Sequence, residues 1–257
     1  MRPLPHFLQS PLLRSVTGVY HAFLGMDPVA DRGRRERLRE VFSLSADVVG
    51  TLKQVHSATV LRYGPGDGDA PGGWKREGDA LWTDGPETGV GVHTADCVPI
   101  LLAHREFPLA VAVHAGWRGL AAGVVAETVR SVARKYGATA AAGLVAAAGP
   151  CARECCYEVG EETAEALSSV PGGDARLRKG REPRKWMADL QGIALSALDA
   201  AGVPGGSSEG VGPCTVCSPR FHSFRREKSL TGRQLSFIYI WDFSREPENR
   251  HPRQVPL

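Results

Sequence analysis

Hydrophobic periodicity divides the middle of the chain into strands and helices. Residues 109–114 alternate larger and smaller side chains, which predicts a strand that ends at His114, on the face opposite Val111 and Val113. Residues 120–136 carry apolar side chains at helical spacing, and Gly137 is placed to end that helix. Further strands are predicted at 89–92, 100–102, 144–148 and 235–240, and further helices at 161–168 and 190–201. Strands outnumber helices and do not simply alternate with them, so we expect an α+β fold: a single domain with a mixed β-sandwich flanked by helices.

The ends of the chain and its glycine-rich segments interrupt this pattern. We expect one domain over residues 1–257, with residues 1–16 and 246–257 as peripheral tails. The Arg-rich run at 32–39 predicts the solvated face of a helix whose apolar side carries Leu38, Val41 and Phe42. Loops are predicted at 64–73, 171–173 and 204–212.

Composition limits the functional classes. The 257 residues are 42% hydrophobic and 23% charged, with a net charge of +3, which is ordinary for a soluble globular protein and offers no strong basic face for nucleic acid. No apolar stretch approaches the roughly 20 residues needed to cross a membrane, and the N-terminus lacks a secretory signal pattern. We therefore expect a cytoplasmic protein without nucleic-acid or membrane partners. There the six cysteines would be reduced and available for metal binding or catalysis.

Three residues on separate segments suggest the chemistry: His56, Cys97 and His114. Two imidazoles and a thiolate form a ligand set for Zn²⁺ or copper, and three protein ligands leave one coordination position open for a reaction. The alternative for Cys97 is a buried structural cysteine. His56 follows the polar-apolar alternation of residues 53–55, which predicts that it ends a strand. Composition alone does not distinguish His56 from the other histidines.

The neighbours of these residues allow several roles. Pro99 is expected to interrupt the strand near Cys97 and expose the thiol at a bend. Asp96 could act as a general acid/base, orient a ligand histidine, or cap a turn. Arg118, in a glycine-flanked turn that opens a helix, could bind phosphate or carboxylate. Trp117 fits either the core or a stacking surface for a planar ring.

Two cysteine groups compete for a metal. Cys214 and Cys217 form a C-x-x-C pair, and Cys151, Cys155 and Cys156 form a second cluster. Together they could bind a structural zinc, although the chain has no second C-x-x-C. Pro213 and Pro219 favour a loop around the pair over a redox motif at a helix start.

Short motifs along most of the chain together resemble the laccase-domain family, also called polyphenol oxidase-like or YfiH-type proteins. They cover the chain from about residue 20 to 240 in a consistent order. The motifs are Lys-Gln-Val-His at 53–56, Gly-Asp-Ala-Leu at 78–81, Thr-Ala-Asp-Cys-Val-Pro at 94–99, His-Ala-Gly-Trp-Arg-Gly at 114–119, Gly-Pro-Cys at 149–151, Tyr-Glu-Val-Gly at 157–160, Cys-Thr at 214–215, Phe-His-Ser-Phe-Arg-Arg at 221–226 and Gly-Arg-Gln at 232–234.

The resemblance implies a metal bound by His56, Cys97 and His114, with zinc as the expected ion and copper as the alternative. It also implies phosphorolysis of adenosine, inosine, guanosine and methylthioadenosine, and deamination of adenosine. The expected catalytic residues are then Asp96, Cys97, His114 and Arg118, with Asp96 moving a proton. The expected substrate or phosphate ligands are Gln54, Arg118, Phe224 and Arg225. The partners would be purine nucleosides and phosphate.

One segment departs from the family pattern, and other activities stay open. The family has an Arg, a phosphate ligand, shortly after a His-Gly-Phe segment; residues 21–26 lack it, which supports deamination more than phosphorolysis unless Arg32 substitutes. The alternatives are a copper-dependent polyphenol oxidase, a metal-free hydrolase using Cys97 with His114, and a zinc-stabilised interaction module. The chain has no His-x-His pairs of the kind that hold a multicopper cluster.

Overall fold

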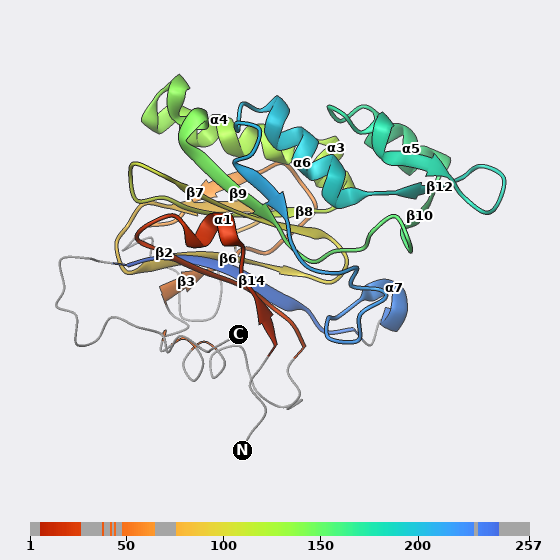
Figure 1. Cartoon of the computed structure of the whole chain (residues 1–257), viewed down its shortest axis with the longest axis horizontal. Coiled ribbons are helices and arrows are strands. Elements are labelled where there is room, and N and C mark those ends of the chain that lie inside the picture. Colours follow the sequence, from red (N-terminus) through yellow and green to blue (C-terminus); the bar gives the residue numbers. More distant parts are fainter. Residues whose placement is uncertain are drawn as a thin grey trace, which may run out of the picture.

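Two β-sheets pack face to face, and helices cover the outer face of the larger one (Figure 1). The computed structural model describes residues 6–26, 38, 42, 44, 48–64, 76–228 and 231–241. The larger sheet has six strands in the order β13 (Ser208–Gly210), β9 (Leu144–Ala148), β7 (Val98–His104), β8 (Ala110–Ala115), β5 (Ala80–Thr83) and β4 (Val60–Arg62). The second has five, in the order β1 (Phe7–Leu8), β2 (Val19–Leu24), β14 (Gln234–Ile240), β6 (Thr88–Thr94) and β3 (Val49–Gly50). Each sheet mixes parallel and antiparallel pairs, so the predicted α+β fold with a mixed sandwich is confirmed.

The helices lie mainly on one side of the sandwich. Helices α3 (Trp117–Ala121), α4 (Val124–Tyr136) and α6 (Leu190–Ala200) pack on the larger sheet, whereas α5 (Glu161–Ser168) packs on a small third sheet. The remaining elements are α1 (Pro11–Arg14), α7 (Phe224–Glu227), the 3-10 helices η2 (Ala138–Gly143) and η3 (Asp174–Arg176), and the third-sheet strands β10 (Glu158–Gly160), β12 (Lys185–Ala188) and β11 (Leu177–Lys179). Within the described residues, no helix has both the length and the apolar character to cross a membrane.

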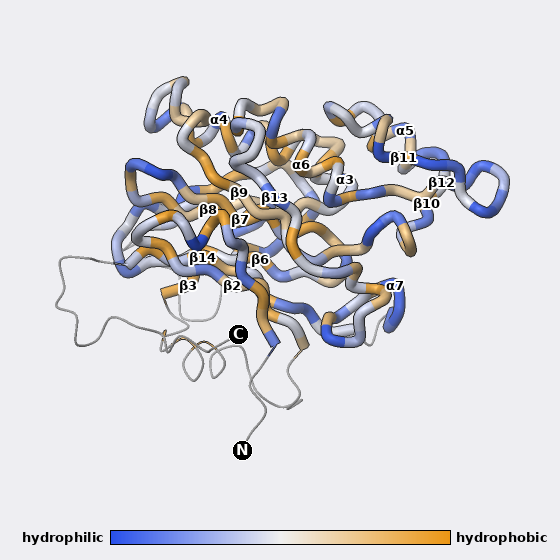
Figure 2. The backbone as a smooth tube through the Cα atoms, in the orientation of Figure 1, coloured by the Kyte–Doolittle hydropathy of each residue, from blue (hydrophilic) through white to orange (hydrophobic). Residues whose placement is uncertain are grey.

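Strand alternation builds a separate core on each face of the larger sheet (Figure 2). In β8, Val111 and Val113 face the helices, whereas Ala110 and Ala112 face the second sheet. His114 continues the Ala110–Ala112 face at the end of the strand, as the alternation predicts. The sheet therefore delivers a buried histidine to one edge of the sandwich, where it can contact neighbouring loops.

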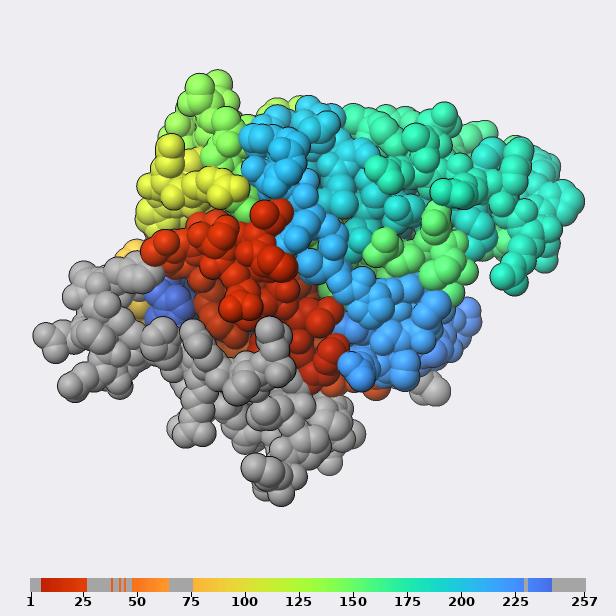
Figure 3. Space-filling view, in the orientation of Figure 1, coloured from red at the N-terminus to blue at the C-terminus, as the bar shows by residue number. Residues whose placement is uncertain are grey.

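The predicted tail at residues 1–16 is packed over most of its described length. Strand β1 pairs with β2, and Leu13 and Val16 are buried between the sheets, so residues 7–16 are not peripheral. Their apolar side chains explain this, because each removes hydrocarbon surface from water. Figure 3 shows this segment, in red, against the rest of the molecule. The predicted tail at 246–257 lies outside the described residues. Of the Arg-rich helix, only Leu38 and Phe42 are described, and both are buried. The extent of the domain over 1–257 stays a prediction.

Three local predictions were wrong. The loop predicted at 204–212 contains strand β13, which pairs in parallel with β9. The helix expected at 120–136 is broken: α3 ends at Ala121 and α4 begins at Val124, because Gly123 has a left-handed backbone (φ 82°). His56 does not end a strand but lies in a loop with φ 61°. The strands predicted at 89–92, 100–102, 144–148 and 235–240 and the helices predicted at 161–168 and 190–201 are present, with bounds shifted by at most a few residues. The loop predicted at 64–73 lies outside the described residues except for residue 64.

Candidate metal centre

Three chain segments bring His56, Cys97 and His114 to one edge of the sandwich. Cys97 lies in the turn by which the chain passes from β6 in one sheet to β7 in the other, and His114 is the penultimate residue of the neighbouring strand β8. His56 reaches them from the loop before β4. Their ligand atoms all lie within 4.8 Å of one another, and the Cys97 Sγ is 3.9 Å from the His56 Nε2. The imidazoles of His56 and His114 meet edge to face, with ring centroids 4.8 Å apart.

Asp79, immediately before β5, organises this group from beneath. One carboxylate oxygen lies 2.8 Å from the His114 Nδ1 and accepts the His56 N–H at 2.9 Å. The other accepts the N–H and hydroxyl of Ser57 at 2.6 and 2.8 Å, and the Val55 N–H at 3.3 Å. The carboxylate is fully buried. The Asp79 carboxylate therefore fixes both the His114 ring and the loop that carries His56. The left-handed backbone of His56 is held by these hydrogen bonds.

The sequence reasoning did not assign a role to Asp79. Two signals were available: Asp79 belongs to the Gly-Asp-Ala-Leu motif at 78–81, and it directly precedes the apolar strand Ala80–Thr83, where an unpartnered carboxylate would be costly to bury. Nothing local in the sequence identifies the five donors, because they come from residues 22 to 35 positions away.

Gly116 provides the space in which the ligands meet. A Cβ atom at this position would lie 2.9 Å from the His56 Cδ2 and 3.0 Å from the Cys97 Sγ. Its backbone is ordinary (φ −74°), so glycine is needed here for close approach and not for an unusual conformation.

The charges within the group favour a thiolate beside an imidazolium when no metal is present. Burial alone would raise the pKa of Cys97, but hydrogen bonds with His114 and His56 lower it to about 6. Burial likewise disfavours the charged form of His114, yet Asp79 and Cys97 raise its pKa to about 9. For Asp79, burial is again outweighed, by His114 and Ser57, and its pKa falls to about 2. The metal-free site therefore already stabilises the charged forms of Asp79, Cys97 and His114.

This donor set fits a transition-metal ion. Two imidazole nitrogens and one thiolate suit zinc or copper. Tetrahedral Zn²⁺ with bonds of about 2.0 and 2.3 Å would place a ligand nitrogen and sulfur about 3.5 Å apart, close to the separation of His56 and Cys97. The contact from Asp79 to the His114 Nδ1 leaves the Nε2 atom for a metal, as is usual for metal-binding histidines. His56 is exposed and His114 is buried, so the open coordination position would lie on the exposed side of the ligand set.

A pocket of about 750 Å³ opens beside the three ligands. Its wall carries four cationic side chains, from Arg118, Arg225, Lys228 and Arg233. Among the described residues, no carboxylate lies within ion-pair distance of any of them. Lys228 and Arg233 were not predicted as site residues. The pocket thus combines an open ligand set with a strongly positive wall.

Aromatic rings hold two of these cations. The Arg118 guanidinium lies 4.3 Å from the centroid of the Trp117 ring, and that of Arg225 lies 4.2 Å from the centroid of Tyr157. Trp117 also packs against the core, as one of its predicted roles requires, and its role as a stacking surface for a planar ring stays a prediction. Phe224 is 51% exposed at the pocket, which suits a surface for a planar ring.

Asp96 and Gln54 support the backbone of the site. The Asp96 carboxylate accepts hydrogen bonds from the Thr215 hydroxyl (2.6 Å), the Ser223 hydroxyl (3.1 Å) and the Arg225 N–H (2.7 Å). It therefore anchors the start of α7, and the carboxylate that contacts the ligand His114 is Asp79, not Asp96. Gln54 lines the pocket but uses its side-chain amide to pair with the backbone N–H and C=O of His93.

Comparisons with known proteins agree with this architecture. The profile of the family described as multi-copper polyphenol oxidoreductase laccase matches residues 24–241. Purine nucleoside phosphorylase YfiH of Escherichia coli is 34% identical over 222 residues, which cover 85% of this chain and 84% of that protein. A purine nucleoside phosphorylase of Clostridium acetobutylicum is 36% identical over 193 residues, which cover 74% of this chain and 76% of that protein.

Solved structures show the same fold. YlmD from Geobacillus stearothermophilus superimposes with a TM-score of 0.79 at 26% identity, over 94% of this chain and 98% of that one. YfiH of Bacillus licheniformis gives a TM-score of 0.78 at 25% identity, over 86% and 92% of the two chains. The profile matches most of the chain, the relatives match over most of their length, and the fold is shared. This chain therefore belongs to the YfiH-type laccase-domain family.

Proposed function

We propose that this protein is a metal-dependent enzyme that cleaves purine nucleosides by phosphorolysis and also deaminates adenosine. The observation that carries the proposal is the juxtaposition of an open three-ligand set, His56, Cys97 and His114, with a pocket whose wall bears four cations. Relatives that cover most of this chain are named purine nucleoside phosphorylases, which supports purine nucleosides and phosphate as the substrates. We place the reaction in the cytoplasm, where free thiols persist.

Zinc is the ion we propose for the three ligands, with copper as the alternative. Bound zinc supplies Lewis acidity, which can activate water or polarise a substrate atom. The contribution of the chain is to hold the ligands: Asp79 fixes the orientation of His114, and Gly116 allows His56 and Cys97 to approach each other. The buried side of the site excludes water, whereas the exposed side admits the reactant.

For phosphorolysis, we assign phosphate binding to Arg118 and Arg225. A phosphate oxygen forms a bond to C1′ of the ribose while the bond from C1′ to the purine nitrogen breaks, and the departing base takes up the proton that hydrogen phosphate loses. Planar guanidinium groups can each donate two hydrogen bonds to phosphate and hold it against the sugar. The rings of Trp117 and Tyr157 position these two arginines, which reduces the freedom they lose on binding.

For deamination, water adds at the purine carbon that bears the amine and ammonia leaves. Phe224 is the proposed surface for the purine ring. We do not assign the proton transfer to Asp96, because its two oxygens already accept three hydrogen bonds. In this proposal Asp96 is a positioning residue that holds Arg225 at the pocket.

The experiment is a product analysis of metal-quantified protein incubated with adenosine, with and without phosphate. Adenine formed only with phosphate supports phosphorolysis, and inosine supports deamination. Cys97→Ala should abolish both phosphorolysis and deamination, while circular dichroism should show that the fold is retained. Oxidation of a phenol without purine turnover would instead establish the copper oxidase. Full activity after complete chelation would favour the pair of Cys97 and His114 as nucleophile and base.

A further inference from the structure

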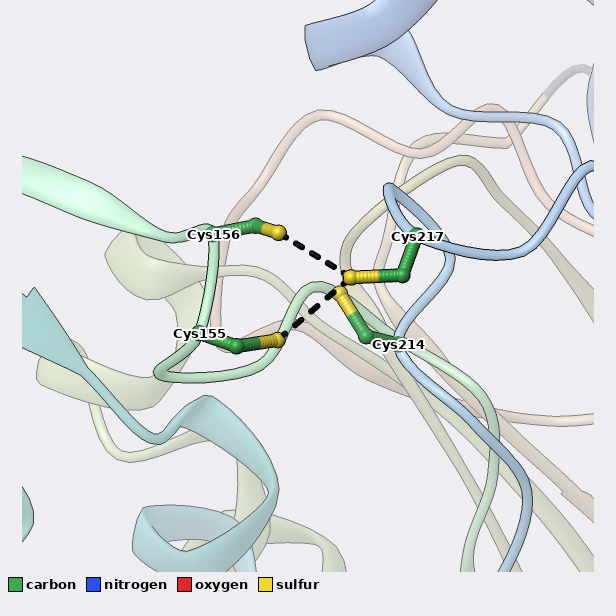
Figure 4. Close-up of side chains that lie close together, drawn as sticks. All are labelled: Cys155, Cys156, Cys214 and Cys217. Carbon is green, nitrogen blue, oxygen red and sulfur yellow. Dashed lines mark hydrogen bonds between the residues drawn. The ribbon is translucent and has the colours of Figure 1, made fainter.

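A second group of potential metal ligands, made of four cysteines, is separate from the set of His56, Cys97 and His114. The thiols of Cys155, Cys156, Cys214 and Cys217 point toward one another from two loops (Figure 4). All four sulfur atoms lie within 4.8 Å of one another. The Cys217 Sγ is 3.7 Å from that of Cys155 and 3.2 Å from that of Cys156. Cys151, the remaining cysteine of the predicted cluster, is buried in the hydrophobic core and is not a member.

The spacing of the sulfurs suits a tetrahedral metal site. Four thiolates around Zn²⁺ with bonds of about 2.3 Å would lie about 3.8 Å from one another. Disulfides, by contrast, join sulfurs about 2.05 Å apart and would group the four as pairs. Here the Cys217 sulfur contacts two other sulfurs, so the four do not separate into two pairs.

The backbone around Cys214 also favours a metal-binding thiolate. The N–H of Arg153 donates to the Cys214 sulfur at 3.4 Å. Hydrogen bonds from amides stabilise a negative sulfur. Cys214 is buried, so its sulfur charge would be costly without a cation nearby.

We propose that Cys155, Cys156, Cys214 and Cys217 bind a structural Zn²⁺ ion that joins two loops, one of which leads into the pocket residue Tyr157. Four thiolate ligands complete the tetrahedral shell and leave no position for a substrate, unlike the set at His56. On zinc binding, each thiol that is still protonated releases its proton, and no oxidation occurs. This inference does not depend on the proposed reaction.

The two loops carry residues that shape the pocket. Tyr157 directly follows Cys156, and its ring holds the guanidinium of Arg225. Thr215 lies between the cysteines of the C-x-x-C pair, and its hydroxyl donates to Asp96 beside Cys97. The Thr215 N–H also bonds to the Cys151 carbonyl, which ties the two loops through their backbones. Zinc would add a covalent link at the outer end of this connection.

The first test measures zinc in protein purified under reducing conditions and dialysed against buffered zinc. Cys155→Ser and Cys217→Ser should each lose about one equivalent per chain relative to wild type. Cys151→Ala is the matched control, because it removes a nearby cysteine outside the cluster and should retain the zinc. His56→Ala should lose only the metal of the other site. Zinc contents of Cys155→Ser and Cys217→Ser equal to that of wild type would overturn the proposal.

A second measurement avoids the risk that these variants do not fold. X-ray absorption of zinc in the His56→Ala protein should show a shell of sulfur ligands only, at about 2.3 Å. Removing this zinc should increase hydrogen exchange in residues 151–158 and 214–226 and expose four thiols to a disulfide reagent. A nitrogen or oxygen shell, or a disulfide within the cluster in protein blocked at lysis, would contradict the site.

Discussion

The Nδ1 atom of His114 lies 2.8 Å from the carboxylate of Asp79, and this contact fixes the geometry of the candidate metal centre. Because the same carboxylate also accepts the backbone N–H of His56, one buried acidic residue positions two of the three ligands. Carboxylates in this position orient the ring and raise its basicity as a ligand.

Asp79→Asn should weaken metal binding by 10- to 100-fold, roughly the cost of removing such a partner. The amide would present hydrogens to groups that are themselves donors, so we also expect a loss of about 3 kcal/mol in unfolding free energy. Chelator competition and urea denaturation measure the two effects. Glu77→Gln is the control: it removes a nearby acid that pairs with Lys53 on the surface and should change neither quantity. Wild-type metal affinity in Asp79→Asn would contradict the assigned role.

The stability contributed by Asp79 should depend on pH in metal-free protein. Its pKa is lowered from 3.8 to about 2 in the folded state, so the contribution is fully present above pH 3.8 and is lost as the pH falls through 2. The difference in unfolding free energy between wild type and Asp79→Asn should therefore shrink between about pH 4 and 2. Urea denaturation at a series of pH values measures it, and a constant difference would show that the carboxylate is not stabilised by folding.

Gly116→Ala should displace metal ligands without unfolding the protein. The added Cβ would lie about 3 Å from both His56 and Cys97, closer than such atoms can settle without movement. We expect at least a 10-fold loss of metal affinity by chelator competition, roughly 1.4 kcal/mol. Gly160→Ala is a matched control, because Gly160 also precedes a helix with nearly the same backbone angles and has no atom within 4 Å of the added carbon. Equal metal binding in both variants would contradict a close-packed site.

Cys97 should react as a thiolate at unusually low pH once the metal is removed. Its pKa of about 6 predicts that alkylation by iodoacetamide rises through pH 6 and then levels off. His114→Ala removes the hydrogen bond and charge that lower this pKa, so the rise should move toward the ordinary cysteine value of about 8.5. Peptide mapping follows Cys97 separately from the other cysteines. An unchanged profile in His114→Ala would show that the imidazole does not stabilise the thiolate.

Arg225→Ala should impair phosphate use if the proposed phosphorolysis is correct. Its backbone N–H remains, so the contact with Asp96 and the start of α7 are retained. We expect the KM for phosphate to rise about 10- to 100-fold, the effect of losing a charged hydrogen-bonding group worth roughly 1.5–3 kcal/mol. Arg130→Ala, which removes an exposed arginine on α4, should leave KM unchanged. A fall in kcat alone would argue against phosphate binding by Arg225.

Local patterns were sufficient for most of the secondary structure. The alternation at 109–114 correctly placed His114 opposite Val111 and Val113, because side chains of a strand point to alternating faces. The break between α3 and α4 was missed, since apolar spacing continues through Gly123 and only its left-handed backbone shows the interruption. The packing of residues 7–16 was missed because a strand of two residues gives no periodic signal.

By itself, the sequence determined which residues could supply soft metal ligands and which family motifs they belong to. It could not determine that Asp79 joins the site or that Asp96 instead anchors Arg225, because those choices depend on hydrogen bonds between segments up to 129 residues apart. The same holds for the cysteines: Cys155 and Cys217 are separated by 62 residues, and only the folding of two loops against each other brings their sulfurs together. Ligand chemistry is a property of each side chain, whereas convergence on one point in space is a property of the packed sheets and loops.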